Sequence, residues 1–86
     1  MPKNKYACRV CGYIYPVPPY GDDGDSPTYN YCPCCGVEYG YQDFTPEGVR
    51  MYREEWLSRG RLWHDPKEEP ENWDWIEQSK NIPDDF

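Results

Sequence analysis

The stretch CRVCGY at residues 8–13 returns in altered form as CPCCGV at residues 32–37. In each stretch two cysteines stand three positions apart, and a glycine follows the second one. The two residues between the cysteines fold into a tight turn that aims both sulfurs the same way. A glycine with positive φ lets nearby backbone N–H groups point at the sulfurs, which offsets the charge of metal-bound thiolates. We therefore expect each stretch to supply two ligands to one metal ion.

The two C-x-x-C pairs are separated by 20 residues (12–31), a spacing that fits known zinc sites. Four cysteine ligands are typical of zinc or iron, so we expect one Zn²⁺, with one Fe as the alternative. Because protein thiolates fill all four positions, we expect this metal to be structural. The expected ligands are Cys8, Cys11, Cys32 and Cys35.

The fifth cysteine, Cys34, is a second possible ligand in the second pair. A glycine directly follows both Cys11 and Cys35, and this matching register favours Cys35 over Cys34. We expect Cys34 to lie near the metal without binding it. The alternative is a redox-reactive or exchangeable ligand, because a thiol near a metal can have a lowered pKa.

The composition indicates a core that needs support. The chain has 86 residues, of which only nine are Val, Ile or Leu, while nine are Tyr, four Trp and two Phe. Small domains with so little aliphatic mass usually need a disulfide or a metal. We expect an aromatic core packed against the metal site, and the metal to be required for folding.

The two halves of the chain predict different structures. Over residues 6–44 we expect a metal-binding unit of short β-hairpins, with strands at 13–15, at 28–31 and between 37 and 44. Over residues 45–86 we expect a helical extension that packs on this unit through its tryptophans. Thr45 and Pro46 predict the start of a helix over 46–59, and a second helix is expected over about 72–80, capped by Asn72 or Asp74. The expected whole is one small metal-bound α+β domain, 1–86.

The segments VCGYIY (10–15) and CPCCG (32–36) resemble the two metal-binding knuckles of rubredoxins. The resemblance implies a rubredoxin-like or zinc-ribbon fold with four-sulfur coordination over about residues 6–44. The chain departs from simple rubredoxins in its shorter loop between the pairs and in its extension, and these departures favour zinc over electron transfer by iron. It is also similar to small cysteine-rich bacterial proteins of unassigned function that carry a CPCCG segment.

The charge bears on possible partners. The formal net charge of −7 argues against nucleic acid, because proteins that bind phosphate backbones carry basic patches. A basic protein suits the acidic chain better, and the acidic stretch 65–86 is a candidate docking face. The tryptophans could instead form a ligand-binding aromatic cage. His64, the only histidine, is expected to have a surface or capping role.

No secretory signal and no run of about 18 apolar residues is found, so we expect a cytoplasmic protein without a membrane span. In a reducing cytosol, paired cysteines more often bind a metal than form disulfides. The odd number of cysteines, five, also fits poorly with a framework made only of disulfides. No acid–base or nucleophile pattern appears, so we do not expect an enzyme. The expected function is a zinc-stabilised protein-interaction or accessory module. The alternatives are a rubredoxin-like iron electron carrier and, less favoured, a nucleic-acid-binding zinc ribbon.

Overall fold

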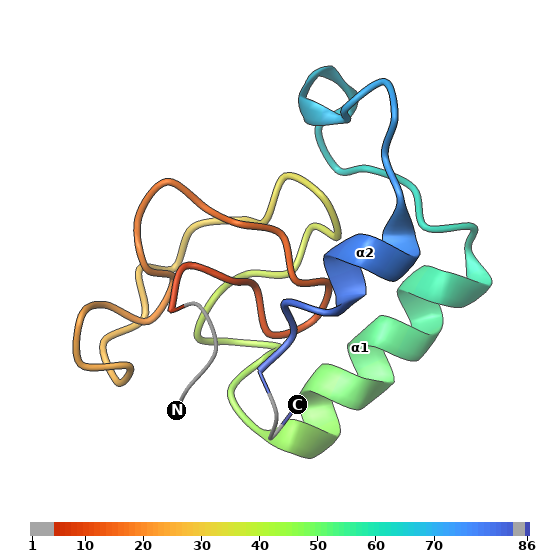
Figure 1. Cartoon of the computed structure of the whole chain (residues 1–86). Coiled ribbons are helices and arrows are strands. Elements are labelled where there is room, and N and C mark those ends of the chain that lie inside the picture. Colours follow the sequence, from red (N-terminus) through yellow and green to blue (C-terminus); the bar gives the residue numbers. More distant parts are fainter. Residues whose placement is uncertain (1–4, 84–85) are drawn as a thin grey trace.

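The computed structural model describes residues 5–83 and 86. Its helices are α1 (Pro46–Ser58), the 3-10 helix η1 (Pro66–Glu68) and α2 (Trp75–Ser79). The loops of residues 5–44 lie to one side of α1 and α2, and the segment between the helices projects away from them (Figure 1). No helix in the described part of the chain is long and apolar enough to cross a membrane.

The first C-x-x-C turn, residues 8–12, is closed by backbone hydrogen bonds and is called the first knuckle. The N–H of Cys8 donates to the carbonyl of Tyr13, and the N–H of Gly12 donates to the carbonyl of Cys8, both at 2.9 Å. Gly12 has φ +80°, in the left-handed region that favours glycine. Ala7, just before the turn, and Ile14, just after it, form an antiparallel bridge at its base.

The second C-x-x-C turn, residues 32–36, repeats this arrangement and is called the second knuckle. The N–H of Cys32 donates to the carbonyl of Val37, and the N–H of Gly36 donates to the carbonyl of Cys32, again at 2.9 Å. Gly36 has φ +81°, and Tyr31 forms an antiparallel bridge with Glu38. The recurrence seen in the sequence is therefore a recurrence of backbone structure.

The expected α+β ribbon of β-hairpins is wrong. Within residues 5–83 and 86 there is no β-strand, and the only β-type pairings are the two isolated bridges. The segments expected as strands, at 13–15, at 28–31 and between 37 and 44, do not form ladders. Pro16 follows the first bridge and Tyr29, with φ +61°, precedes the second, so neither pairing extends. Each knuckle is a closed turn with a short paired base.

Helix α1 begins and ends as its sequence predicts. The side chain of Thr45 accepts a hydrogen bond from the N–H of Gly48 at 3.1 Å, and Pro46 occupies the first turn. At the other end, Gly60 has φ +90°, and the N–H of Arg61 donates to the carbonyl of Trp56 at 3.0 Å. This is a Schellman termination. The helix predicted over 46–59 is confirmed, one residue shorter at its end.

Helix α2 is shorter than predicted, because it spans only Trp75–Ser79 of the expected 72–80. Its cap is Asp74, one of the two residues predicted for this role. The Asp74 side chain accepts hydrogen bonds from the N–H groups of Ile76 and Glu77 at 3.0 and 3.4 Å. So short a helix depends on tertiary contacts for its stability.

The four tryptophans pack between the helices and the knuckles. Trp56 of α1 contacts Trp75 of α2 edge-on, with ring centroids 5.1 Å apart. Trp63 contacts Trp73 at 5.3 Å and Tyr13, beside the first knuckle, at 5.7 Å. Edge-on aromatic pairs add to the stability gained from burying their area. Residues 45–83 are thus packed against the loops mainly through aromatic rings, with Val49 of α1 as the buried aliphatic side chain.

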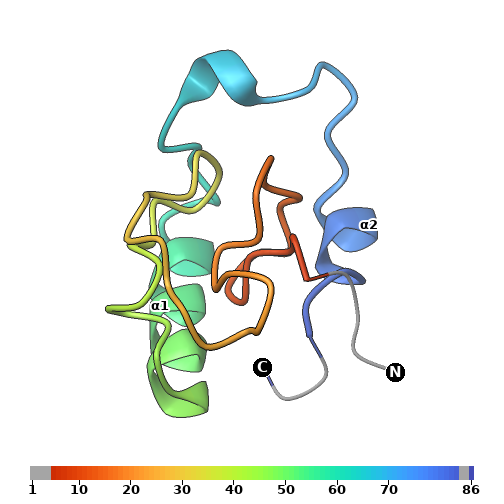
Figure 2. The same ribbon diagram turned by 90° about the vertical axis from the view of Figure 1, so that its left-hand side faces the viewer.

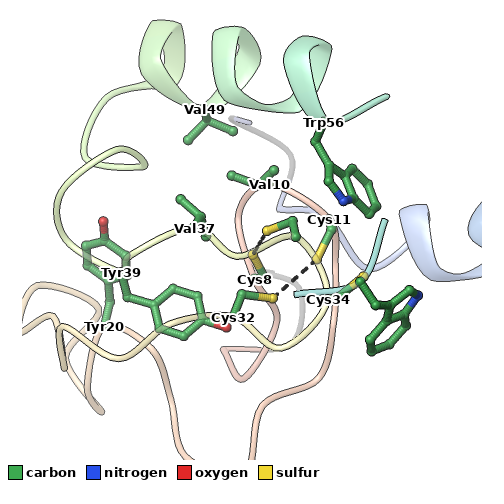
Figure 3. Packing of buried hydrophobic residues seen from close by; sticks show 12 residues of the cluster. Cys8, Val10, Cys11, Tyr20, Cys32, Cys34, Val37, Tyr39, Val49 and Trp56 are labelled. Carbon is green, nitrogen blue, oxygen red and sulfur yellow. Dashed lines mark hydrogen bonds between the residues drawn. The ribbon is translucent and has the colours of Figure 1, made fainter. Parts of the chain in front are cut away.

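The core surrounds the cysteines. All five cysteines are buried, together with three valines and four large aromatic residues (Figure 3). The aromatic core expected from the composition is therefore present. Its largest apolar members are Val10, Val37, Val49, Tyr20, Tyr39, Trp56 and Trp63.

A buried carboxylate connects the loops to the start of α1. Asp43 is fully buried, and its Oδ1 accepts hydrogen bonds from the hydroxyl of Tyr20 and, at 2.7 Å, from the N–H of Gly40. Arg9 of the first knuckle donates to the carbonyl of Asp43 at 3.1 Å, and its guanidinium stacks on the Tyr20 ring at 3.5 Å. Burial raises the pKa of the Asp43 carboxyl, and these donors act against that rise.

Gly12 should be intolerant of a side chain. A Cβ there would lie 2.3 Å from the carbonyl oxygen of Gln78, and the positive φ adds strain. We expect Gly12→Ala to lower the free energy of unfolding by about 2 kcal/mol or more, since clash and strain add. Gly24→Ala is the control, because Gly24 has φ +75° but no atom within 4 Å of an added Cβ. Gly24→Ala should lower the free energy of unfolding by only about 1 kcal/mol, because it adds strain without a clash.

Thermal unfolding followed by circular dichroism measures this difference. For a domain of this size, 2 kcal/mol lowers Tm by roughly 10 °C. Equal losses in the two variants would contradict the close packing of α2 on the first knuckle.

Candidate metal centre

The two knuckles bring four cysteine sulfurs together. The Sγ atoms of the four cysteines predicted as ligands all lie within 4.8 Å of one another, and all four residues are buried. Sγ of Cys8 is 3.7 Å from Sγ of Cys35, and Sγ of Cys11 is 3.6 Å from Sγ of Cys32 (Figure 3). Each short distance therefore joins one knuckle to the other. None of the five cysteines is in a disulfide.

The spacing of the sulfurs suits a tetrahedral ion. With metal–sulfur bonds of about 2.3 Å, tetrahedral geometry places the sulfurs about 3.8 Å apart. The two shortest distances, 3.6 and 3.7 Å, are close to that edge. A set of four sulfurs in this geometry is characteristic of zinc or iron. The four cysteines are thus positioned to bind a metal ion.

The protonation of the four sulfurs agrees with a role as ligands. Burial raises the pKa of the thiols of Cys8, Cys11 and Cys35. Burial also acts on Cys32, but hydrogen bonds from the other three thiols and from the backbone N–H of Cys35 hold its pKa well below the usual range. A metal ion binds cysteine as the thiolate, so a bound cation would displace the remaining thiol protons and offset the buried negative charge.

Helix α1 is attached to both knuckles by side-chain hydrogen bonds. Arg53 donates from Nε to the carbonyl of Val10 at 2.7 Å and from Nη2 to the carbonyl of Arg9 at 2.9 Å. Tyr52 donates from its hydroxyl to the carbonyl of Cys35 at 3.1 Å. One helix thus fixes the backbone beside ligands from both knuckles.

Helix α2 connects the same two knuckles through one amide. Gln78 donates from Nε2 to the carbonyl of Cys11 at 3.0 Å and to Sγ of Cys34 at 3.3 Å. Its Oε1 accepts a hydrogen bond from Nε1 of Trp73 at 2.7 Å. The amide nitrogen of Gln78 therefore joins the two knuckles, and its oxygen ties this side chain to Trp73.

The roles of three of these positioning residues were missed in the sequence analysis. The spacing of Val49, Tyr52 and Trp56 predicts one face of a helix. The hydrogen bonds of Tyr52 and Arg53 to the knuckles were not predicted, although Arg53 stands four residues after Val49. That periodicity could have identified both residues. Gln78 carries no such signal, because nothing in the local sequence distinguishes it from an exposed polar residue.

Cys34 lies outside the group of four sulfurs. It is fully buried, and its Sγ accepts the hydrogen bond from Gln78. Its carbonyl accepts a hydrogen bond from the N–H of His64 at 3.0 Å. The structure thus uses Cys34 in the contact between the second knuckle and the segment after α1.

The predicted ligands are not equally enclosed. Cys35 is 5% exposed, while the other three are fully buried, and it lines a cavity of about 360 Å³ together with Arg59, Trp63 and His64. His64 is exposed and stacks on Tyr31 with ring centroids 5.9 Å apart. Within the described residues, His64 does not belong to the metal-binding group. Of the four predicted ligands, Cys35 therefore lies nearest to the open surface.

The chain has relatives in Bacillus subtilis. It is 33% identical over 87 aligned positions to the protein of strain 168 named "Uncharacterized protein YozI", and the alignment spans 83% of this chain and 71% of YozI. It is 31% identical over 87 positions to "Uncharacterized protein YoaQ" of the same strain, spanning 83% of this chain and 73% of YoaQ. No family model matches the chain. No solved structure matches it either.

Proposed function

This chain belongs to the family of the Bacillus subtilis proteins YozI and YoaQ, and we propose that it is a zinc-binding protein-interaction or accessory module. The observation that carries the proposal is the group of four buried sulfurs at tetrahedral spacing. In this proposal the metal organises the fold, and the surface of the C-terminal half binds a partner.

A structural rather than catalytic metal is supported by the ligand set. Four protein thiolates leave no coordination position for water or substrate, in contrast to catalytic zinc sites. Backbone carbonyls of both knuckles also accept hydrogen bonds from side chains of α1 and α2. We therefore propose a non-enzymatic role, with zinc as the resident ion. Iron bound by the same sulfurs is the alternative, and the metal content of the purified protein distinguishes the two.

A basic protein partner is supported by the surface between α1 and α2. This segment projects from the rest of the molecule, as both views show (Figures 1 and 2). Glu68, Glu69 and Glu71 are exposed on it, and Leu62 and Ile76 at its two ends are 70% and 65% exposed. Acidic side chains beside exposed apolar ones can attract a basic partner and then bury area against it. We propose this segment, residues 62–76, as the docking face.

The metal can be tested directly on purified protein. When the chain is expressed with zinc and iron both available, we expect a colourless protein with one zinc per chain, because zinc has no visible absorption. A strong chelator, or Cys32→Ser, should abolish the near-UV circular dichroism, since the core depends on the ion. Cys34→Ser is the matched control and should retain the metal, because Cys34 lies outside the four-sulfur group.

Two results would count against this account of the metal. A chelated protein with unchanged near-UV circular dichroism would show that the ion does not organise the fold. A red protein that bleaches reversibly on reduction would replace zinc with iron and favour the electron-carrier alternative.

The docking face can be tested by comparing two variants of equal charge. Glu69→Gln with Glu71→Gln removes charge from the proposed face, whereas Glu54→Gln with Glu55→Gln removes it from exposed positions of α1. With the full chain as bait in lysate of its own cell, we expect the first variant to lose most of a specifically captured protein and the second to retain it. Capture should also weaken with salt. Equal capture by both variants would refute this face as the docking site.

A further inference from the structure

Tyr39 has the largest side chain that is completely buried among the described residues. Its hydroxyl oxygen is buried too, and no described atom lies in hydrogen-bond geometry with it. Burying a hydroxyl without a partner is unfavourable, because the group gives up its hydrogen bonds to water. A phenylalanine would fill the same space without that cost, so the hydroxyl needs an explanation.

The surroundings of Tyr39 direct its hydroxyl toward the four-cysteine site. The backbone N–H of Tyr39 donates to the carbonyl of Asn30 at 2.9 Å, and an edge contact with Tyr15, with centroids 5.4 Å apart, holds the ring. The side chain extends from there toward Cys32 (Figure 3). A tyrosine hydroxyl keeps its proton at neutral pH, so this buried group can donate a hydrogen bond.

We propose that the Tyr39 hydroxyl donates a hydrogen bond to Sγ of Cys32 when the four cysteines hold their metal. The proposal rests on the metal binding proposed above. A neutral thiol is a weak acceptor, whereas hydrogen bonds to an ionised group are short and strong. Because metal binding keeps Cys32 as a thiolate, a small movement that brings the hydroxyl into hydrogen-bond geometry with this sulfur then becomes favourable. Tyr39 is in this sense a positioning residue for one ligand.

The repeat of the two knuckles gives this contact a built-in comparison. Tyr15 stands after the first knuckle where Tyr39 stands after the second, and its N–H donates to Tyr6 just as that of Tyr39 donates to Asn30. Tyr15 is partly exposed, however, while Tyr39 is fully buried against the cysteines. In the described part of the chain, the repeat therefore places a fully buried hydroxyl after the second knuckle and a partly exposed one after the first.

The extra donor makes the two knuckles chemically unequal. Four thiolates around a divalent ion carry two surplus negative charges, and hydrogen bonds to sulfur offset them. With its added donor, the metal-bound thiolate of Cys32 should be better stabilised than that of its counterpart Cys8. Its sulfur should also be the less nucleophilic of the two, because the hydrogen bond withdraws electron density from it.

The test uses wild-type protein and Tyr39→Phe, each loaded separately with Zn²⁺ and Co²⁺. Phenylalanine keeps the buried ring and removes only the donor. Since a hydrogen bond to a charged group is worth about a factor of ten in affinity, we expect roughly tenfold weaker Zn²⁺ binding in competition with a chelator. The sulfur-to-cobalt charge-transfer band should move to lower energy, because the sulfur lone pairs lose a stabilising donor. Tyr15→Phe is the control and should change neither value.

The outcomes separate this proposal from the function on which it rests. If wild-type protein binds neither ion with a thiolate band, the metal site itself fails. If wild-type protein binds Co²⁺ but Tyr39→Phe matches it in affinity and band position, only the hydrogen bond is refuted. Weaker binding with an unshifted band would also overturn the proposal, since it would reflect packing alone. Near-UV circular dichroism of the Zn²⁺-loaded variant verifies that its fold is retained.

Discussion

Four buried sulfurs within 4.8 Å of one another are the constraint on which the rest of this structure depends. The described loops have no sheet to support them, and few aliphatic residues are available to bury. Two closed turns hold the sulfurs, and α1 and α2 bind the carbonyls of those turns through Arg53, Tyr52 and Gln78. Each of these contacts requires the knuckles to keep their relative position. A shared metal ion is the interaction that would fix that position, with the helices as its outer support.

Part of this arrangement could be predicted from the sequence and part could not, and physical reasons separate the two parts. The cysteine pairs were recognised because C-x-x-C-G specifies its own turn, and α1 because Thr45, Pro46 and Gly60 specify its two ends. The strands were predicted wrongly because β pairing needs a partner over several residues, and Pro16 and the positive φ of Tyr29 end each pairing after one bridge. The roles of Gln78 and Tyr39 could not be predicted, since both depend on segments distant in sequence.

Membership in the family of YozI and YoaQ brings no stated activity with it, so the proposed function depends on the site itself. The site has two chemically distinct sides. On one side Tyr39 and the loops enclose Cys32, and on the other a cavity beside Arg59 and His64 reaches Cys35. Among the four cysteines, Cys35 is thus the one beside the open surface near α1, while the other three are fully enclosed. We propose the acidic, projecting segment after α1 as the part of the surface that binds a partner.

The most direct test of this account is X-ray absorption at the edge of the native metal, measured on the purified full chain together with its metal content. The account predicts one metal ion per chain with four sulfur neighbours at about 2.3 Å and no lighter neighbour in the first shell. A nitrogen or oxygen neighbour, fewer than four sulfurs, or a folded protein that contains no metal would contradict it.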